Sequence, residues 1–325
     1  MEKRVSVAPM MGQTDRHFRY MISLMANDVK LYTPMIHAEA IVRSEKNFLK
    51  KENNNQKKVG IQIAGNDPKI MARAVNIVQR YNYNEINLNI GCPSERVQNC
   101  SVGVALMKQP YLVADIVDHL IKVTNLPISI KSRIGVDDYD NYEFLYDFID
   151  QTSSAGCDHF IIHARKAILK GLSPKENRKI PPLDYERVRQ IKSDFNSLRI
   201  EVNGEIDSID KIESQLKIFD GVMIGRESYK NPFFLAEVQD CFFKNTAKLS
   251  KYDFMIKMIE YIEREAEAGA SVHLITRHMT QLFKGTNGAK EWRNLIGGNS
   301  SHKKDLKSLI NEILVFIDNR EEILV

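Results

Sequence analysis

Several motifs that would assign a function directly are missing from this sequence. Its four cysteines include no CxxC pair and no histidines at zinc-ligand spacing, which argues against a disulfide framework and a structural metal. No G-x-G-x-x-G follows an apolar run and no G-x-x-x-x-G-K-[ST] is present, so neither a Rossmann unit nor a P-loop is supported. No apolar run approaches the roughly 20 residues that span a bilayer, and the start MEKRVSVAPM is unlike a signal peptide. We therefore expect a cytoplasmic protein with no membrane partner.

The composition is that of an ordinary globular protein. The chain has 325 residues, of which 43% are apolar and 27% charged, enough for one large core and a smaller second one. Its formal net charge of +4 permits a polyanionic partner without requiring one, so the distribution of charge matters more than its total. We expect the protein to act as a monomer.

Eight short apolar runs, rich in β-branched residues, recur at intervals long enough for a helix between them. They are Val5–Ala8, Leu31–Met35, Val59–Ala64, Glu85–Ile90, Pro127–Lys131, His159–His163, Arg199–Asn203 and Gly221–Ile224. Intervening stretches such as Pro68–Tyr81 and Leu112–Val123 have the apolar spacing of helices. This alternation predicts an α/β fold, a closed parallel (β/α)8 TIM barrel, with a doubly wound open sheet as the alternative.

The last part of the chain has the pattern of helices alone. The letters SKYD from Ser250 predict a helix cap. Apolar residues recur at helical spacing in three stretches, Phe254–Ile262, Val272–Phe283 and Asp305–Leu324. We therefore predict two domains, a barrel over residues 1–243 and an all-helical bundle over residues 244–325.

Catalytic groups of a TIM barrel lie where strands end and loops begin, so polar residues after the apolar runs are the candidates for a site. The candidates are Pro9, Met10, Gln62, Asn89 to Cys92, Lys131 to Arg133, His163 to Arg165, Asn203 to Glu205, Gly225 and Arg226. Glycines and backbone amides after the last two strands are the recurrent phosphate site of the fold. Asn203-Gly204-Glu205 and Gly225-Arg226 are placed for that role, although a lone glycine more often only turns the chain.

Lys131 and Gln62 suggest what the site would hold. The Lys131 ammonium would point into a partly desolvated barrel mouth, where it requires a negative partner. A reduced flavin, anionic around N1 and C2=O, is one such partner, and a neighbouring carboxylate is the alternative. The amide of Gln62 offers donors and an acceptor to the pyrimidine edge of a flavin. His163 fits the same site, although a single histidine is more often a satisfied core residue.

Cys92 is the most informative single residue. It lies between a glycine and a proline after a buried strand, where its thiol would face the mouth and deliver a proton. The alternative is an inert buried cysteine. We expect that role for Cys157 and Cys241, whereas Cys100 is ambiguous.

Long segments of the chain occur together in one order. They are SVAPM (Ser6–Met10) followed by TDRHFRY (Thr14–Tyr20), NLNIGCPSERVQN (Asn87–Asn99), FIIHARKA (Phe160–Ala167), GLSPKENRKIPPLDY (Gly171–Tyr185) and RHMTQLFKGTNGAKEWR (Arg277–Arg293). Together they resemble the tRNA-dihydrouridine synthases, and most closely the bacterial A branch. The resemblance covers nearly the whole chain.

The resemblance implies a reaction in which NADPH reduces FMN, the reduced flavin gives hydride to C6 of a uracil, and a cysteine protonates C5. Cys92 matches that cysteine, and Asn89 matches a contact with the target base. The positions that match FMN binding are Pro9, Met10, Gln62, Lys131, His163, Asn203, Gly204, Glu205, Gly225 and Arg226. For this branch the usual target is uridine 20, and often 20a, in the D-loop of tRNA.

A uridine inside folded tRNA must be extruded before it can stack on a flavin, so the protein must hold the surrounding RNA. Two basic stretches suit this task, Arg165–Lys179 and Arg277–Lys307, although charge runs are usually only solvated faces. Within them, the positions that resemble the family's tRNA contacts are Lys175, Arg178, Lys290 and Arg293.

Several residues depart from the family pattern, including Val104, which stands where alanine is usual, and Lys290, which stands where arginine is more usual. Gly12 stands where an acidic residue is common, Pro34 where glutamate is common, and Glu205 where a second glycine is common. A carboxylate at position 205 would repel a phosphate unless it pointed away, whereas the backbone amide could still donate.

Two other functions are compatible with parts of the sequence. A flavin barrel enzyme acting on a free pyrimidine, of the dihydroorotate or dihydropyrimidine type, shares the chemistry but needs no basic helical tail. An RNA-binding or chaperone module without catalysis would not need Cys92, Lys131 and His163 together. Cys92, Lys131 and His163, together with the basic helical tail, favour reduction of uridine in tRNA over these two alternative functions.

Overall fold

The computed structural model describes residues 4–44, 58–243, 249–297 and 306–319. The chain forms two compact units, and neither is continuous in sequence. The first unit consists of residues 1–12 and 30–225, and the second of residues 13–29 and 226–325. The segment 13–29 therefore leaves the first unit soon after its first strand.

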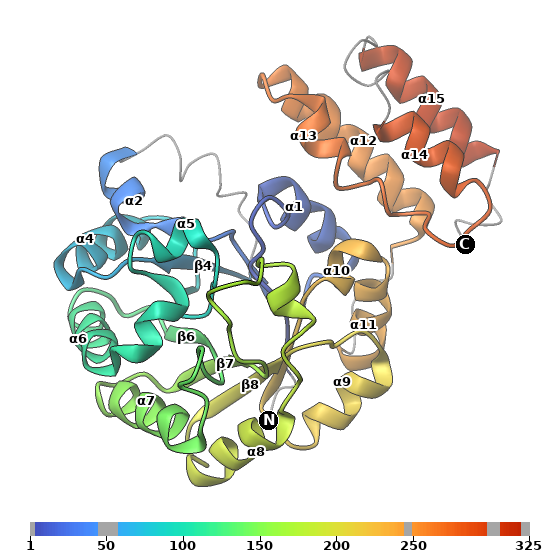
Figure 1. Cartoon of the computed structure of the whole chain (residues 1–325). Helices are drawn as coiled ribbons and strands as arrows, with labels where there is room; N and C mark the ends of the chain where they lie inside the picture. The colour runs from blue at the N-terminus through green and yellow to red at the C-terminus, as the bar shows by residue number, and fades with distance from the viewer. Residues whose placement is uncertain (1–3, 45–57, 244–248, 298–305, 320–325) are drawn as a thin grey trace. The chain divides into compact units, whose positions relative to one another are not determined.

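A nine-stranded parallel sheet forms the centre of the first unit. Its strands are β1 (Arg4–Val7), β2 (Leu31–Tyr32), β3 (Ile36–His37), β4 (Val59–Ala64), β5 (Glu85–Asn89), β6 (Ile128–Arg133), β7 (His159–His163), β8 (Arg199–Asn203) and β9 (Gly221–Ile224). They are hydrogen-bonded in the order β1-β9-β8-β7-β6-β5-β4-β2, and β3 also pairs with β4. A parallel bridge from Ser6 to Lys30 joins β1 to the residue before β2. The ring of strands in Figure 1 is thus a closed TIM barrel, as predicted, and not an open sheet.

Helices surround this ring (Figure 1). They are α2 (Ala38–Ser44), α4 (Pro68–Val78), α5 (Glu95–Gln98), α6 (Pro110–Ile121), α7 (Tyr142–Ser154), α8 (Tyr185–Asp194) and α9 (Ile209–Leu216), with the 3-10 helices η1 (Gly103–Lys108) and η2 (Glu176–Arg178). Several begin at a capping side chain, as when Asp67 Oδ1 accepts a hydrogen bond from the amide of Ile70 at 2.9 Å. Among the helices of the described residues, none has the length and apolar character needed to cross a bilayer.

The predicted second strand, Leu31–Met35, is divided in two by Pro34. Proline has no amide N–H for a strand ladder. Next to it, the Thr33 hydroxyl oxygen accepts from the amide of Gln62 at 3.1 Å, where a backbone carbonyl would otherwise accept. Pairing with β4 resumes at Ile36.

Alternate residues of each strand face the inside of the barrel. Part of this interior is apolar, with Ala8, Tyr32, Ile161 and Met223 in one buried cluster against which Met10 packs. Polar side chains occupy other interior positions, and all are almost fully buried: Ser6, Gln62, Glu85, Asn87, Ser129, His159 and Glu201. Burying polar groups is costly unless they are hydrogen-bonded to one another.

The second unit is helical. It contains α1 (Arg16–Met25), α10 (Glu227–Lys230), α11 (Phe234–Phe242), α12 (Lys251–Glu267), α13 (Val272–Thr276), α14 (Ala289–Gly297) and α15 (Leu306–Asp318). The predicted cap is present, because Ser250 Oγ accepts from the amide of Asp253 at 3.0 Å. The core of this unit includes Trp292, whose ring centroid lies 4.8 Å from that of Phe283 and 5.1 Å from that of Phe316.

The helix expected over Val272–Phe283 is shorter than predicted. It ends at Thr276, and turns follow. In a continuous helix the carbonyl of Met279 would accept from the amide of residue 283. Here it accepts from the indole N–H of Trp292 at 2.7 Å instead. The last helix, predicted over Asp305–Leu324, spans Leu306–Asp318 and is followed by a turn at Asn319, so it ends earlier than predicted. Asp305 and Leu324 themselves lie outside the described residues.

Helix α1 belongs to the second unit through side-chain contacts with α12 and the segment after α13. Asp15 caps α1 and pairs with Arg277 and with His278, whose Nε2 lies 3.0 Å from the carboxylate. The Tyr20 ring stacks on that of Tyr261 with centroids 3.8 Å apart. These contacts explain why an N-terminal segment groups with the C-terminal helices.

The predicted domain boundary at residue 243/244 differs from this division into units. Residues 13–29 and 226–243 fall in the predicted barrel domain but belong to the helical unit by compactness. Compactness does not establish which residues carry out catalysis or bind RNA, so the two-domain assignment by function stays a prediction.

We expect Asp15→Asn to lower the free energy of unfolding of the helical unit by about 1–3 kcal/mol at neutral pH. Asparagine can still cap α1, but it leaves Arg277 and His278 without an anionic partner. Burial alone would raise the pKa of the Asp15 carboxyl, but His278, Arg277 and the amide of Phe18 outweigh it and hold this pKa well below its usual range. The wild type should therefore lose more stability than the variant as pH falls below about 4.

Denaturant titration followed by tryptophan fluorescence measures this effect, because the only tryptophan, Trp292, is buried in the helical unit. The matched control is Asp118→Asn, which removes an exposed ion pair with Lys122 and should cost under about 1 kcal/mol. Equal losses in the two variants would contradict the role of Asp15.

Candidate functional site

The parallel register brings the predicted strand-end residues together at one rim of the barrel. Asn89 on β5 pairs with Lys131 on β6. Arg133 on β6 pairs with His163 on β7, which pairs in turn with Asn203 on β8. Because carboxyl ends of parallel strands meet at the same edge, these side chains share one end of the barrel.

Cys92 lies in a tight turn after β5 that the Asn89 side chain holds. Asn89 Oδ1 accepts from the amide of Gly91 at 3.3 Å and from the amide of Cys92 at 3.0 Å. The thiol is half-buried and lies 3.4 Å from the Ser94 hydroxyl. Gly103 packs on the turn at φ +69°, and a Cβ there would come within 2.7 Å of the Cys92 carbonyl oxygen. Any larger residue at 103 would displace the turn that carries the thiol.

Lys131 is held by an amide and not by a carboxylate. Its Nζ donates to Asn203 Oδ1 at 3.1 Å, and Asn203 Nδ2 donates to the carbonyl of Met223 at 2.7 Å. Burial and the Arg133 guanidinium lower the pKa of the Lys131 ammonium, and the charge of a Cys92 thiolate opposes both, so that the pKa is about 7. This site therefore favours an anionic ligand near Lys131.

Arg133 was among the strand-end candidates, but no role in the site was predicted for it from the sequence. Its Nε donates to the carbonyl of Gly91 at 2.9 Å, next to Cys92. Its Nη1 donates to the carbonyls of Lys166 and Asn177 at 3.0 and 3.1 Å. Burial lowers the pKa of this guanidinium to about 10, so it stays charged at neutral pH. A charged residue at an inward strand position was the signal that could have identified it.

The loops after β8 and β9 contain the glycines predicted to approach a phosphate. Gly204 has φ +138°, and a Cβ would lie 2.6 Å from Leu183 Cδ2 and 3.4 Å from His163 Cδ2, so only glycine fits beside His163. A Cβ on Gly225 would meet nothing closer than Asn203 Nδ2 at 3.9 Å. Gly225 ends the first unit, and Arg226, which is half-buried, begins the second.

Glu205 departs from the family pattern at a position with glycine-like geometry. Its φ is +48°, a conformation that costs a side-chain-bearing residue about 1 kcal/mol. Its carboxylate pairs with Arg165 at 2.5 Å, and the guanidinium is almost fully buried. The charge of Glu205 is therefore largely neutralised, and its carboxylate is directed to Arg165.

Three further residues matched to the flavin lie on the first unit. Pro9 and Met10 follow β1 and are half-buried. Gln62 on β4 is only 1% exposed, and both ends of its amide are hydrogen-bonded to asparagines of β5. No contact of these three residues with a cofactor is established, and their assignment stays a prediction.

The side chains predicted to contact RNA are exposed. Lys175 precedes η2, Arg178 is its last residue, and Lys290 and Arg293 lie on α14. The loop around η2 is built on Asn177, which is fully buried and whose Nδ2 donates to the carbonyl of Ile168 at 2.8 Å. A rigid loop that presents cations to solvent is suited to phosphate contact.

Some basic residues of the two predicted stretches serve the protein itself. Arg165 is buried and donates to the carbonyls of Lys179 and Pro181 as well as to Glu205. Lys166 pairs with Asp140 at 2.7 Å, and Arg277 pairs with Asp15. Lys303 and Lys304 lie outside the described residues.

The other cysteines differ from Cys92 in their surroundings. Cys157 is buried as expected, and burial raises the pKa of its thiol to about 12. Cys241 was also expected to be buried, but it is exposed on α11, because it falls on the outward face of that helix. Cys100 is exposed.

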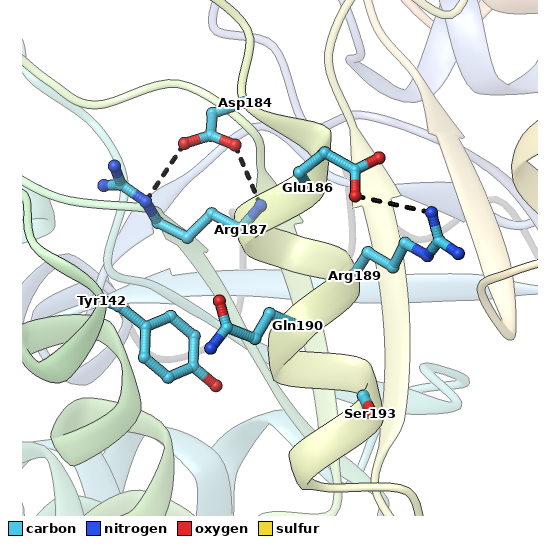
Figure 2. A pocket seen from close by; sticks show the side chains of 7 residues that line it. All are labelled: Tyr142, Asp184, Glu186, Arg187, Arg189, Gln190 and Ser193. Carbon is cyan, nitrogen blue, oxygen red and sulfur yellow. Dashed lines mark hydrogen bonds and ion pairs between the residues drawn. The ribbon is translucent and has the colours of Figure 1, made fainter.

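A separate surface pocket of about 510 Å³ lies along α8 and is shown in Figure 2. It is lined by Tyr142, Asp184, Glu186, Arg187, Arg189, Gln190 and Ser193. Its charged side chains pair with each other, Asp184 with Arg187 and Glu186 with Arg189. The strand-end residues described above do not line this pocket, so it is not the candidate site.

Comparison with known proteins identifies the family. The dihydrouridine synthase family model matches residues 6–318. The chain is 47% identical over 302 residues to a tRNA-dihydrouridine(20/20a) synthase of Vibrio cholerae, covering 92% of each chain. It is 44% identical over 321 residues to the protein of the same name from Escherichia coli strain K12, covering 98% of this chain and 92% of that one. A third, from Shewanella oneidensis, is 44% identical over 304 residues, covering 93% and 90%.

We expect the cofactor-free protein to become more stable between about pH 7 and pH 10, and Lys131→Met to lack this part of the increase. Below the folded pKa of about 7 the ammonium is charged in both the folded and unfolded chain, so its burial costs stability in full. Above 10.5, the ordinary value, it is neutral in both. Between these values the unfolded chain binds more protons, so the free energy of unfolding rises with pH.

Denaturant titrations at about pH 7, 8 and 9 measure this slope. Lys122→Met, at the exposed residue after α6, is the matched control and should keep the wild-type slope. An anionic ligand bound near Lys131 should reduce the slope in the wild type. Identical slopes in the wild type and in Lys131→Met would refute the pKa assignment.

Proposed function

This chain belongs to the dihydrouridine synthase family, and from that premise we propose that it reduces uridine to 5,6-dihydrouridine in tRNA, with bound FMN and with NADPH as the hydride source. The relatives named above are tRNA-dihydrouridine(20/20a) synthases, so the proposed targets are uridines 20 and 20a of the D-loop. The observation that carries the proposal is the half-buried Cys92 thiol in a turn held by Asn89, whose neighbour across the strand ladder is Lys131.

The residues of the rim fit a flavin mononucleotide. Lys131 is a half-buried cation with a neutral hydrogen-bond partner, which suits the anionic pyrimidine edge of a reduced flavin. Gly204 and Gly225 come directly after β8 and β9, where the phosphate site of this fold is built from glycines and backbone amides. The remaining residues proposed for the cofactor are Pro9, Met10, Gln62, His163, Asn203, Glu205 and Arg226.

When bound, the reduced flavin supplies the hydride that adds to C6 of the uracil. The proposed role of Cys92 is to donate the proton of its Sγ–H to C5, which completes the addition across the double bond. The cations Lys131 and Arg133 both interact with the charge of the resulting thiolate, so they stabilise it until solvent returns a proton. Asn89 is proposed to hold the target base through its half-buried amide.

The RNA around the target uridine is proposed to contact exposed cations of both units. These are Lys175 and Arg178 beside η2 and Lys290 and Arg293 on α14. Each supplies charge to phosphate and no base readout, so they position the tRNA and do not select the uridine.

The direct test is incubation of the purified protein with FMN, NADPH and unmodified tRNA, followed by mapping of dihydrouridine. Formation at positions 20 and 20a supports the proposal. Equal activity on free uracil would favour a free-pyrimidine reductase instead. A colourless protein that binds RNA but not FMN would favour a non-catalytic RNA-binding module.

We expect Cys92→Ala to keep flavin and tRNA binding while losing at least about 100-fold in the rate of dihydrouridine formation, the usual contribution of a general acid. Single-turnover formation of dihydrouridine, together with the flavin absorption spectrum, measures this. Cys100→Ala, at an exposed cysteine after α5, is the control and should retain full activity. Full turnover in Cys92→Ala would exclude Cys92 as the proton donor.

We expect Arg178→Ala and Arg293→Ala each to weaken tRNA binding about three- to tenfold and to reduce its salt dependence by about one counterion. NADPH oxidation in the absence of tRNA should not change. Arg189→Ala removes an exposed arginine on α8 and should leave tRNA affinity unaltered. Binding isotherms at several salt concentrations provide the test, and unchanged slopes in both variants would remove these contacts.

A further inference from the structure

A continuous series of hydrogen bonds runs through the interior of the barrel to the Cys92 turn. From its buried end, Ser129 Oγ donates to Glu85 Oε1 at 2.5 Å, and Asn87 Nδ2 donates to Ser129 Oγ at 2.7 Å. Gln62 Nε2 donates to Asn87 Oδ1 at 2.7 Å, and Asn89 Nδ2 donates to Gln62 Oε1 at 2.8 Å. We call these five residues, Glu85, Ser129, Asn87, Gln62 and Asn89, the interior chain.

Glu85, at one end of the interior chain, fixes the direction in which its hydrogen bonds run from donor to acceptor. Burial acts to raise the pKa of its carboxyl, but the Lys30 ammonium, His159 and the bonds from Lys30 and Ser129 outweigh it, so this pKa is lowered. An ionised carboxylate can only accept. Ser129 must therefore donate its single hydroxyl hydrogen to Glu85, so toward its other neighbour, Asn87, it can only accept.

The orientations of the other side chains in the interior chain follow from which of their atoms can donate and which can accept. Since Ser129 accepts, Asn87 must turn its NH₂ to Ser129 and its oxygen to Gln62. Gln62 must then turn its NH₂ to Asn87 and its oxygen to Asn89. Asn89 in turn must direct its NH₂ to Gln62, which leaves its oxygen for the amides of Gly91 and Cys92.

The Asn89 end of the interior chain independently requires the same direction of hydrogen bonding. Main-chain amides only donate, so the side-chain atom of Asn89 that faces Gly91 and Cys92 must be the oxygen. Turning any one amide around would set donor against donor on one side and acceptor against acceptor on the other. In a buried series such a mismatch costs far more than the same mismatch in water.

We propose that Ser129, Asn87 and Gln62 are positioning residues that hold the Asn89 amide in a single orientation and thereby fix the turn that carries the Cys92 thiol. This inference rests on the proposed function, in which that thiol is the proton donor. One N–H of Gln62 Nε2 serves Asn87, and the amide has a second, so a contact of Gln62 with the flavin remains compatible with this role. Ser129 and Asn87 are fully buried, so they act through Gln62 and Asn89.

The test compares two serine-to-alanine variants of the same strand in the FMN-loaded protein. Ser129→Ala removes the hydroxyl that sets the sense of the interior chain. Ser132→Ala, also fully buried on β6, removes a hydroxyl with no hydrogen-bond partner among the described residues. The two changes delete the same atom, so the cost of cavity and packing is matched.

For Ser129→Ala we expect kcat for dihydrouridine formation to fall about tenfold, roughly the effect of one lost buried hydrogen bond, with KM for tRNA and FMN affinity within about twofold of wild type. The rate of Cys92 alkylation by iodoacetamide, followed on its own peptide by mass spectrometry, should change at least about threefold. Ser132→Ala should match the wild type in all four measurements. Equal kcat and equal alkylation rates in the two variants would overturn the proposal.

Alkylation of Cys92 does not depend on the reaction, so it separates this inference from the proposed function. A wild-type protein that forms no dihydrouridine would refute the function, whereas an unaltered Cys92 alkylation rate in Ser129→Ala would refute the positioning role alone.

Asn87→Asp gives a second test that does not rely on Ser129. An ionised carboxylate at position 87 can accept from Gln62 but cannot donate to Ser129, whereas the protonated acid does both and reproduces the amide pattern. Activity relative to wild type should therefore rise as pH falls from about 8 to about 6. Glu85 on β5 and Lys131 and Arg133 on β6, the charged inward residues of these two strands, are common to both proteins, so the ratio isolates position 87. A defect that does not vary with pH would contradict the interior chain.

Discussion

Charge buried inside a barrel must be paired on every side, and the first unit is organised around this constraint. Glu85 accepts from Lys30, Tyr32 and Ser129, and Glu201 accepts from Ser6 and faces His159 at 3.1 Å. An apolar interior would pack as well, but it would impose no direction on the groups above it. A buried carboxylate does impose one, because it can only accept. The rim where the site lies is thus built on an interior that specifies hydrogen-bond orientation as well as shape.

Much of the fold could be read from the sequence because the signals are local. Apolar runs and the spacing between them located the strands, and the residues after those runs located the rim from Asn89 to Asn203. The break at Pro34 was missed although the residue was noted. Whether a strand is interrupted depends on the hydrogen-bonding groups of the neighbouring strand, β4, which the sequence does not show. The helix over Val272–Phe283 was predicted too long. The indole N–H of Trp292, 13 residues further along the chain, donates to the Met279 carbonyl, and local spacing could not predict this bond.

What the sequence could not supply is the partner of each polar residue. Asn87 and Ser129 occur within apolar runs, where nothing local indicates that they bond to each other across two strands. Arg165 was read as a phosphate contact because it begins a basic stretch, but its partners are carbonyls of its own loop and Glu205. Asp15 and Arg277 are 262 positions apart, so no periodicity could place α1 with the C-terminal helices. Residue type predicts whether a group can donate, accept or carry charge, and only the fold decides which neighbour it pairs with.

The assignment of α1 to the helical unit bears on the order in which the protein is assembled during synthesis. Residues 13–29 leave the ribosome long before Tyr261, Glu265 and Arg277, which they contact. At ordinary translation rates this delay is on the order of tens of seconds. Throughout it the apolar face of α1, including Phe18 and Met21, has no final packing partner while strands on either side of it can already pair. A fragment beginning after residue 243 would likewise lack α1, so the helical unit is completed only by segments from both sides of the barrel sequence.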